Sequence, residues 1–397
     1  MIVLSFQNSI GDFGIFYNAA ENLSLGLTPF VFQDQKDMYL NGPLLSILLI
    51  PISYVSESVA LTLWRISNVL ITFILVYLLK NERNRSLWIC FLPLMILTFP
   101  WRNNFANTSL VVFQLLLLVL SAKFILKNRP AIGTIFLFVS FELKPYLSIT
   151  FLLILLFCRK FQVLKFLCLY TIIANIVYFW LFNFSYLDWI RALLARSGSW
   201  TDADQSTLRT MLWKYLNVSE NGSTLLGIIF YLAVLFWFFA NLPNNLSEDK
   251  HDYLNSHLLV SSLVTAPLFP FYSHEQDFLL SFFAIGIVLR RTKSIQVEFP
   301  LLLSAVFMLN WSNIDLRAAF VFSLLTSYLL LYGYRLSIRK YYFPLLVCIN
   351  ILSYLAVQIL VEHGTTEQFY FHNLIALIFG ISVVFLYKKS VSALKDL

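Results

Sequence analysis

Long apolar runs, separated by short polar segments, occupy most of the chain. The runs at 110–120 and 345–361 are continuous rather than alternating, which favours membrane-spanning helices over the strands of a spanning barrel. The fold class is therefore all-α. A bilayer core takes roughly 20 helical residues to cross, so we predict a polytopic membrane protein with about 11–13 transmembrane helices. The predicted apolar segments are 58–79, 86–100, 107–126, 130–143, 146–158, 166–184, 223–240, 254–270, 278–290, 298–309, 316–332, 342–360 and 369–387.

Composition strengthens this prediction. Of 397 residues, 59% are hydrophobic and 12% are charged, whereas soluble domains carry roughly a quarter charged residues, so a soluble fold is excluded. The net charge of +7 lies in short clusters between apolar runs rather than on a basic domain, which argues against nucleic acid as a partner. The 4 cysteines have neither CxxC spacing nor a neighbouring His cluster, and we interpret them as small core residues.

The basic clusters also predict the orientation of the chain. Basic residues are enriched in cytoplasmic loops, so the loops that hold most of them face the cytoplasm and the remaining loops face outward. This arrangement predicts a multi-pass protein of the cytoplasmic (inner) membrane. The basic clusters are Lys80/Arg83/Arg85, Lys123/Lys127/Arg129, Arg159/Lys160/Lys165, Arg290/Arg291/Lys293, Arg335/Arg339/Lys340 and Lys388/Lys389/Lys395.

The organisation of the chain follows from this topology. Residues 43–55 are apolar, but a full crossing there would flip every later loop, so we predict a helix in the outer interface. The same topology places Asp12 outside the membrane with no span before it. One interpretation is that the start of the chain is truncated and lacks a first span. We predict a single integral membrane domain, 1–397, composed of a first outer loop with the interfacial helix (12–57), a transmembrane module (58–184), a larger outer loop (185–222) and C-terminal transmembrane helices (223–397).

The outward-facing loops carry a mixed set of carboxylates, imidazole and cations. Such a set suits transfer to a hydroxyl, because a carboxylate accepts the proton while cations neutralise an anionic phosphate leaving group. The charges near apolar segments are costly and therefore indicate a functional path or a paired contact. The outer set is Asp12, Glu21, Arg102, Lys144, Arg191, Arg196, Asp202, Asp204, Arg209, Lys214, His274, Glu275 and Asp277.

The first outer loop carries a distinctive pattern. Asp12 is followed by Tyr17 five residues on, by Ala19-Ala20, by a Leu-Gly pair and Pro29-Phe30, and then by the Asn41-Gly42-Pro43 turn. This pattern resembles the first outer loop of the GT-C-type, polyprenyl-phosphate-mannose-dependent glycosyltransferases, which include the bacterial phosphatidylinositol mannoside mannosyltransferases. The resemblance implies that Asp12 is the catalytic base.

Three later positions fit the same family in order. They are Lys144-Pro145, Asp204-Gln205-Ser206 with Arg209, and His274 with Asp277, so the resemblance spans roughly residues 12–280. The chain departs from the family where the first span is absent and at 103–108, where Asn-Asn-Phe-Ala-Asn-Thr replaces a Gly-Gln pair, so no role is assigned to Asn107.

The resemblance implies an inverting hexosyltransferase that uses a polyprenyl-phosphate sugar, with mannose as the expected sugar. The acceptor is a lipid or glycan hydroxyl, the site lies on the outer face, and neither a metal nor another cofactor is required. Lys144, Arg209 and Arg102 would hold the donor phosphate. The remaining expected substrate contacts are Tyr17, Gln205, His274 and Asp277.

Other interpretations of these residues stay open. Asp12 also fits a helix N-cap, Lys144 also fits a snorkelling side chain or a partner of Glu142, and His274 also fits an interfacial histidine. A transporter or flippase for a lipid-linked saccharide and a polysaccharide polymerase are the competing functions. A transporter predicts matching halves and charges at mid-span, whereas here most charges lie in outer loops. The sugar, the acceptor, the number of spans and the oligomeric state stay open.

Overall fold

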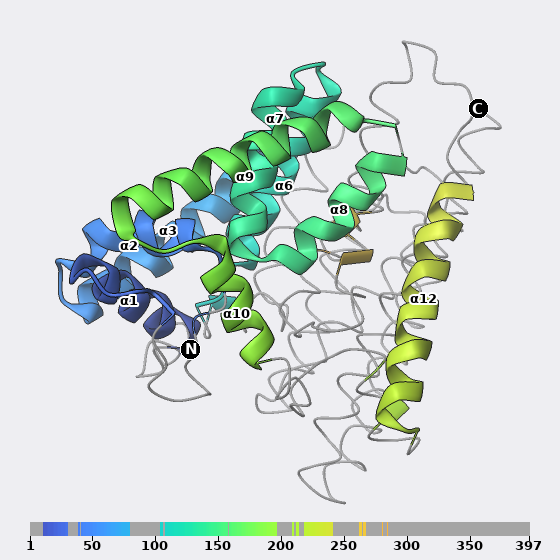
Figure 1. Cartoon of the computed structure of the whole chain (residues 1–397). Coiled ribbons are helices and arrows are strands. Elements are labelled where there is room, and N and C mark those ends of the chain that lie inside the picture. The colour runs from blue at the N-terminus through green and yellow to red at the C-terminus, as the bar shows by residue number, and fades with distance from the viewer. Residues whose placement is uncertain are drawn as a thin grey trace, which may run out of the picture. The chain divides into compact units, whose positions relative to one another are not determined.

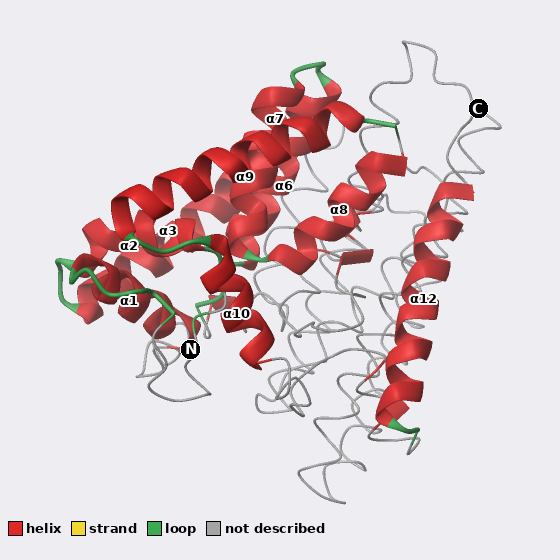
Figure 2. Ribbon diagram, viewed as in Figure 1, coloured by secondary structure: helices red, strands yellow, loops and turns green. Residues whose placement is uncertain are grey.

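Every regular element in the described part of the chain is a helix, as a computed structural model of the protein shows (Figure 2). The all-α prediction is therefore confirmed for these residues. The structure describes residues 11–30, 39, 41–79, 104–105, 108–157, 159–196, 209, 212–213, 218–240, 262–263, 265–266, 280 and 284.

The chain divides into two compact units, which are described separately. The first consists of residues 1–74, 103–202 and 243–262, and the second of residues 75–102, 203–242 and 263–397. The first unit contains the helices α1 (Gly11–Ser24), α2 (Pro43–Ser53), most of α3 (Glu57–Leu79), α6 (Val111–Leu126), α7 (Pro130–Leu143), α8 (Pro145–Phe157), α9 (Phe161–Phe182) and α10 (Tyr186–Arg196). The second unit contains α12 (Glu220–Ala240).

The predicted apolar segments between 58 and 184 and at 223–240 are helical over most of their described residues, with 108–110 and 183–184 outside the helices. The helices α2, α7 and α8 have a proline at their start, where the missing N–H group leaves no hydrogen bond unmade. The α7–α8 boundary lies at Lys144, which has an extended backbone conformation. The predicted spans at 86–100, 298–309, 316–332, 342–360 and 369–387 lie outside the described residues, and those at 254–270 and 278–290 lie almost entirely outside them.

Within the first unit, α7 packs against α6, α8 and α9, and α2 packs against both α1 and α7 (Figure 1). One aromatic-rich group of buried side chains, here called the α1–α3 cluster, joins α1, α2 and α3 to the ends of α7 and α9 and to α10. Phe13 of α1 lies 5.4 Å from the Trp64 ring of α3, measured between ring centroids. The cluster consists of Phe13, Phe16, Ala19, Ala20, Leu23, Phe30, Tyr39, Leu45, Leu49, Ala60, Trp64, Leu110, Leu143, Tyr178, Phe184, Trp189 and Ala192.

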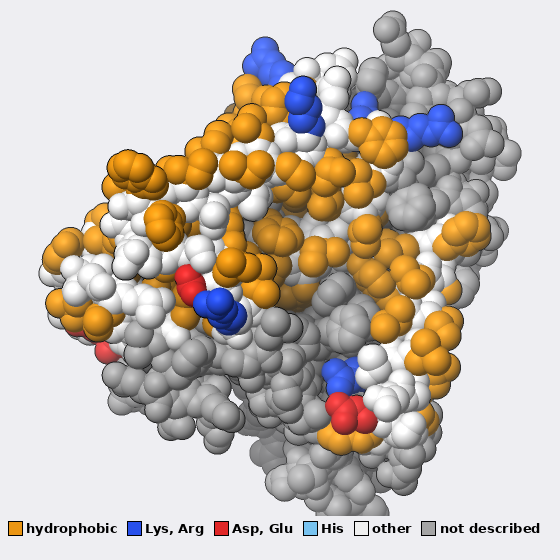
Figure 3. Space-filling view, in the orientation of Figure 1, with side chains coloured by type: hydrophobic (Ala, Val, Ile, Leu, Met, Phe, Trp, Pro, Cys, Tyr) orange, Lys and Arg blue, Asp and Glu red, His pale blue; other side chains and the backbone are white. Residues whose placement is uncertain are grey.

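Two helices in the described part are long and apolar enough to cross a membrane, Glu57–Leu75 within α3 and Phe161–Phe182 as α9. The outward side chains of α9 are large and apolar, with Trp180 83% and Ile172 59% exposed, and hydrophobic side chains cover this helix in the space-filling view (Figure 3). A continuous apolar surface of this kind is unfavourable in water and is satisfied by lipid. The helices therefore indicate membrane association.

The ends of this unit differ in charge. Lys and Arg side chains lie where α6 turns into α7 and where α8 turns into α9 (Figure 3), including the exposed Lys127, Arg129 and Arg159. Because α7 and α8 run between these turns and the turn at Lys144, Lys144 lies at the other end of the two helices.

Candidate functional site

Asp12 lies in the first turn of α1 and is half-buried. Asp12 is the second residue of α1 and directly follows Gly11, whose backbone has φ +52°. The next backbone N–H, that of Phe13, donates to Thr108 Oγ1 at 3.0 Å, and Trp64 Nε1 donates to the Thr108 carbonyl at 3.0 Å. The first turn of a helix has unsatisfied N–H groups. Thr108 accepts one of them and so fixes the backbone beside Asp12.

Tyr17 lies one turn further along α1. Its hydroxyl donates to the Val55 carbonyl at 2.8 Å and lies 3.3 Å from the Ser53 carbonyl, both at the C-terminal end of α2. These contacts clasp α1 to α2. The contact of Tyr17 with substrate stays a prediction. The sequence did not indicate its structural role in joining α1 to α2.

Lys144 lies between α7 and α8 and is 8% exposed. Its Nζ atom lies 5.8 Å from the centre of the Tyr146 ring, in the range of a cation–π contact. The side chain is therefore enclosed by protein and does not snorkel outward. A buried ammonium is a suitable group for an anionic substrate, and binding at this position stays a prediction.

A buried amide fixes the backbone around Lys144. Gln114 Nε2 donates to Ser140 Oγ and Ser148 Oγ at 2.7 Å each and to the Lys144 carbonyl at 3.2 Å. Ser140 Oγ and Ser148 Oγ are also 2.8 Å apart. This network joins α6, α7 and α8, and in an apolar surrounding each of its bonds is costly to lose.

Glu142, two residues before Lys144, is fully buried. Its Oε2 accepts a hydrogen bond from the Leu44 N–H at 3.1 Å, its carbonyl accepts one from the Gly42 N–H at 2.6 Å, and its Oε1 accepts one from the Tyr186 hydroxyl. One residue at the end of α7 therefore binds both the start of α2 and the start of α10.

Two tyrosine hydroxyls support this contact. Tyr39 donates to the Gly42 carbonyl at 2.7 Å and accepts from the Ser46 N–H at 3.1 Å. Burial, followed by the nearby Glu142 carboxylate, raises the pKa of Tyr39 well above its usual value. Burial and the same carboxylate also raise the pKa of Tyr186, so both hydroxyls stay protonated and keep donating.

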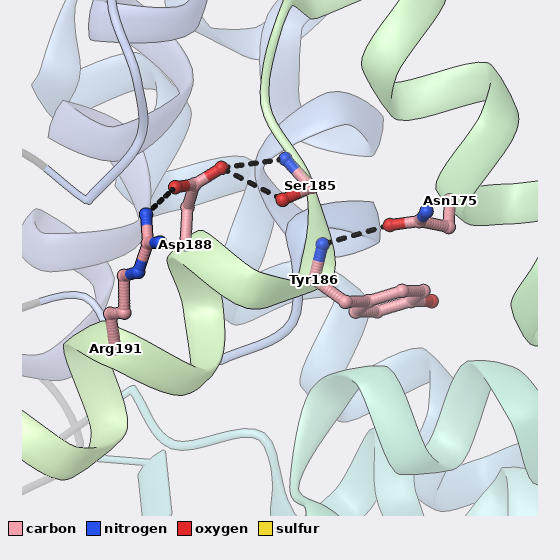
Figure 4. A network of polar contacts seen from close by, with 5 residues as sticks. All are labelled: Asn175, Ser185, Tyr186, Asp188 and Arg191. Atoms are coloured by element: carbon pink, nitrogen blue, oxygen red, sulfur yellow. Dashed lines mark hydrogen bonds and ion pairs between the residues drawn. The ribbon is translucent and has the colours of Figure 1, made fainter.

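The start of α10 is held by a second polar network (Figure 4). Asp188 Oδ2 accepts hydrogen bonds from the Ser185 N–H at 2.8 Å and from the Ser185 hydroxyl at 3.0 Å, and Asn175 Oδ1 accepts one from the Tyr186 N–H at 2.9 Å. Arg191 pairs with Asp188 at 3.3 Å on the exposed side. Arg191 thus behaves as a solvated surface charge, and the network orients Tyr186 toward Glu142.

A third polar group lies along α3. Arg65, Asn68 and Thr72 are nearly completely buried and share one face of this helix, because they are spaced by three and four residues. Asn104 Nδ2 donates to Asn68 Oδ1 at 3.3 Å, which ties this face to the segment that precedes Thr108. The sequence analysis singled out none of these residues, although an arginine inside a predicted span was the available signal.

The remaining predicted site residues are placed only in part. Arg209, in the second unit, forms a 2.7 Å ion pair with Glu220 at the start of α12. Arg102, Gln205, His274 and Asp277 lie outside the described residues. Among the residues that the structure does describe, no group of three His, Cys, Asp or Glu side chains is arranged to hold a metal ion.

The described part of the chain is helical, and its exposed apolar faces define a membrane-associated protein. In it, Asp12 and Lys144 are the sequence neighbours of Phe13 and Leu143, two members of the α1–α3 cluster. Such a carboxylate and such a buried cation are the groups that transfer from a phosphate-linked donor requires.

Residues 39–269, more than half of the chain, match glycosyltransferase family 87. The chain belongs to this family, whose members are GT-C-like membrane enzymes, and it is therefore a glycosyltransferase. The matched region includes Glu142, Lys144 and Arg209, whereas Asp12, His274 and Asp277 lie beyond its ends. No curated protein matches the chain.

Proposed function

We propose that this glycosyltransferase moves a hexose from a polyprenyl-phosphate donor to a lipid or glycan hydroxyl on the outer face of the cytoplasmic membrane. The observation that carries the proposal is that Phe13 and Leu143 lie in one buried cluster. The elements that bear Asp12 and Lys144 therefore pack into one unit. The likeness of residues 12–30 to the loop of the polyprenyl-phosphate-mannose-dependent enzymes supports mannose as the sugar.

In the proposed reaction, the acceptor oxygen attacks the anomeric carbon from the face opposite the phosphate. A carbon–oxygen bond forms to the acceptor, and the bond between the anomeric carbon and the phosphate oxygen breaks, so the configuration inverts. Asp12 takes the hydroxyl proton, and polyprenyl phosphate leaves with the electron pair as a stable anion. Lys144 neutralises that phosphate, so neither a general acid nor a metal is required.

The charge distribution supports an outward-facing site. The exposed bases Lys127, Arg129 and Arg159 lie at one end of α7 and α8, and Lys144 lies at the other. If the basic end faces the cytoplasm, as the positive-inside rule predicts, the turn at Lys144 faces outward. Tyr186 and the rest of α10 join this same end through Glu142.

The other proposed substrate contacts complete the scheme. Arg209 and Arg102 would add positive charge at the donor phosphate, and Arg209 would have to exchange Glu220 for that phosphate. Polar contacts to the sugar, the acceptor or the phosphate would come from Tyr17, Gln205, His274 and Asp277.

A transfer assay with Asp12 variants tests the base assignment. With radiolabelled polyprenyl-phosphate hexoses and purified protein in lipid, Asp12→Asn and Asp12→Ala should lower kcat by about 10²–10⁴-fold, the contribution typical of a general base. Glu21→Gln is the matched control, because Glu21 is an exposed carboxylate on the same helix and should leave the rate unchanged. Normal turnover by Asp12→Asn would refute the assignment.

A flux assay separates the enzyme from the competing transporter. Sealed vesicles that contain the protein and a fluorescent lipid-linked saccharide should show no accelerated flipping, whereas open membranes should form glycosylated product. Flipping without product would contradict the proposed function.

A further inference from the structure

We propose that Glu142 is a positioning residue that sets where Asp12 lies relative to Lys144. This inference rests on the proposed function, because it concerns the geometry between the proposed base and the proposed phosphate-binding cation. Glu142 is two residues from Lys144 and its contacts reach the loop that carries Asp12, although neither composition nor motif spacing predicts such a link.

The first step is the contact between α7 and α2. Gly42, the residue before α2, has no side chain that could cap the helix. The Glu142 side chain accepts a hydrogen bond from the Leu44 N–H instead, at 3.1 Å, and so satisfies one of the open N–H groups at the start of α2. The start of α2 is thus capped by a residue about a hundred positions away in sequence.

The two segments approach so closely that a side chain at 42 would force one of them to shift. A Cβ atom added to Gly42 would lie 2.8 Å from the Cα atom of Glu142, and the Gly42 N–H donates to the Glu142 carbonyl at 2.6 Å. Backbone therefore meets backbone, which fixes the start of α2 relative to α7 more narrowly than side-chain contact alone.

The second step carries this position from α2 to α1. The Tyr17 hydroxyl contacts the Val55 and Ser53 carbonyls just beyond and at the far end of α2, and α1 packs along α2. Glu142 binds the start of α2, and Tyr17 of α1 binds its end. The position of α1 therefore depends on the position of α2. Asp12, in the first turn of α1, is carried with it.

The Glu142 carboxylate is itself fixed by two donors. Tyr186 donates to Oε1 while the Leu44 N–H is bound to Oε2, so both carboxylate oxygens have a donor and the side chain has one preferred orientation. Tyr186 is in turn held through its backbone N–H by Asn175 of α9, at 2.9 Å. Both neighbours of the carboxylate thus belong to elements outside α7.

The kinetic test measures the rate for each donor-binding site. In lipid nanodiscs, the number of sites and the Kd are obtained by titration with a radiolabelled polyprenyl-phosphate hexose under conditions without acceptor. Glu142→Ala should lower kcat per site by about 100-fold, as expected for a displacement of about 1 Å, with the donor Kd within about threefold. Glu142→Gln, which keeps one acceptor oxygen, should lose about tenfold, and Tyr186→Phe should lose less.

A double variant shows whether Glu142 acts through Asp12. In an Asp12→Ala background, Glu142→Ala should cause no further loss of kcat, because the base that Glu142 would position has already been removed. Fewer donor sites with an unchanged rate per site would show a merely structural role and overturn the inference. A further loss in the Asp12→Ala background would also overturn it. Glu21→Gln is the control for changes in carboxylate charge.

A distance measurement keeps the inference testable without turnover. Spin labels at two exposed positions, Asn18→Cys on α1 and Ile132→Cys on α7, are introduced after replacement of the native cysteines by serine. Glu142→Ala should shift or broaden the distance distribution, and Glu21→Gln should not. An unchanged distribution would refute the positioning role, whereas absence of transfer by the wild-type protein would refute the proposed function alone.

Discussion

Substitution of Gly42 by alanine tests the α2–α7 contact through stability. The Gly42 backbone, with φ −65° and ψ 159°, is open to alanine, so the substitution carries no conformational strain. The added Cβ would lie 2.8 Å from the Cα atom of Glu142, a backbone atom that cannot rotate away. Overpacking of this kind costs about 1–3 kcal/mol, against about 0.4–1 kcal/mol gained from a less flexible unfolded chain, so we expect a net destabilisation of about 1–2 kcal/mol.

The free energy of unfolding can be measured by SDS titration in mixed micelles, with tryptophan fluorescence as the signal. Gly222→Ala is the comparison, because the nearest atom to a Cβ there is Ser219 Oγ at 2.9 Å, the end of a side chain and not backbone. This hydroxyl accepts the Gly222 N–H at 3.2 Å, and the loss of that cap offsets the gain of up to about 1 kcal/mol from the helix preference of alanine, so we expect a smaller change than at Gly42. Equal stability of Gly42→Ala and the wild-type protein would refute the close contact.

Two further substitutions probe polar contacts within each of the two units. Gln114→Leu should destabilise the protein by about 2–3 kcal/mol in the same titration, because it leaves the buried Ser140 and Ser148 hydroxyls without their amide partner; a stability equal to that of the wild-type protein would contradict the network. Glu220→Gln should change stability by less than about 1 kcal/mol, since Glu220 is half-exposed, yet it should tighten donor binding if Arg209 contacts the phosphate. Unchanged donor affinity in a titration would argue against that contact.

The helices were largely predictable from the sequence. The segment predicted at 130–143 coincides with α7, and that at 58–79 begins within one residue of α3, because proline and charged residues bound these apolar runs. The helix predicted near 43–55 is also present, as α2. Its placement in the membrane interface stays a prediction, as do the number of spans and the orientation.

One helix inside the predicted outer loop was missed. Residues 186–196 form α10, whose apolar residues Trp189 and Ala192 are buried in the α1–α3 cluster while Arg191 is exposed. A spacing of three residues between Trp189 and Ala192 is typical of one face of a helix, and was available in the sequence. A search for continuous apolar runs overlooks it, because an amphipathic segment interleaves polar with apolar residues.

The candidate site was predictable only where it lies on motifs. Asp12 and Lys144 stand out as charges beside apolar segments, and the structure places both beside the α1–α3 cluster. Gln114 does not stand out, because it is a single amide within an apolar run, and its partners Ser140 and Ser148 are common residues in helices. Which serines a buried amide contacts depends on how α6, α7 and α8 pack, and that is a long-range property.

Glu142 shows most clearly what the sequence leaves undetermined. A pair with Lys144 was one local interpretation of this residue, but the sequence gives no sign that its carboxylate accepts hydrogen bonds from the Leu44 N–H and the Tyr186 hydroxyl. The reason lies in the backbone: the start of α2 presents N–H groups at a part-buried position against α7, and a buried donor without a partner costs about 1–3 kcal/mol. A buried carboxylate also requires donors, so each group satisfies the other's need.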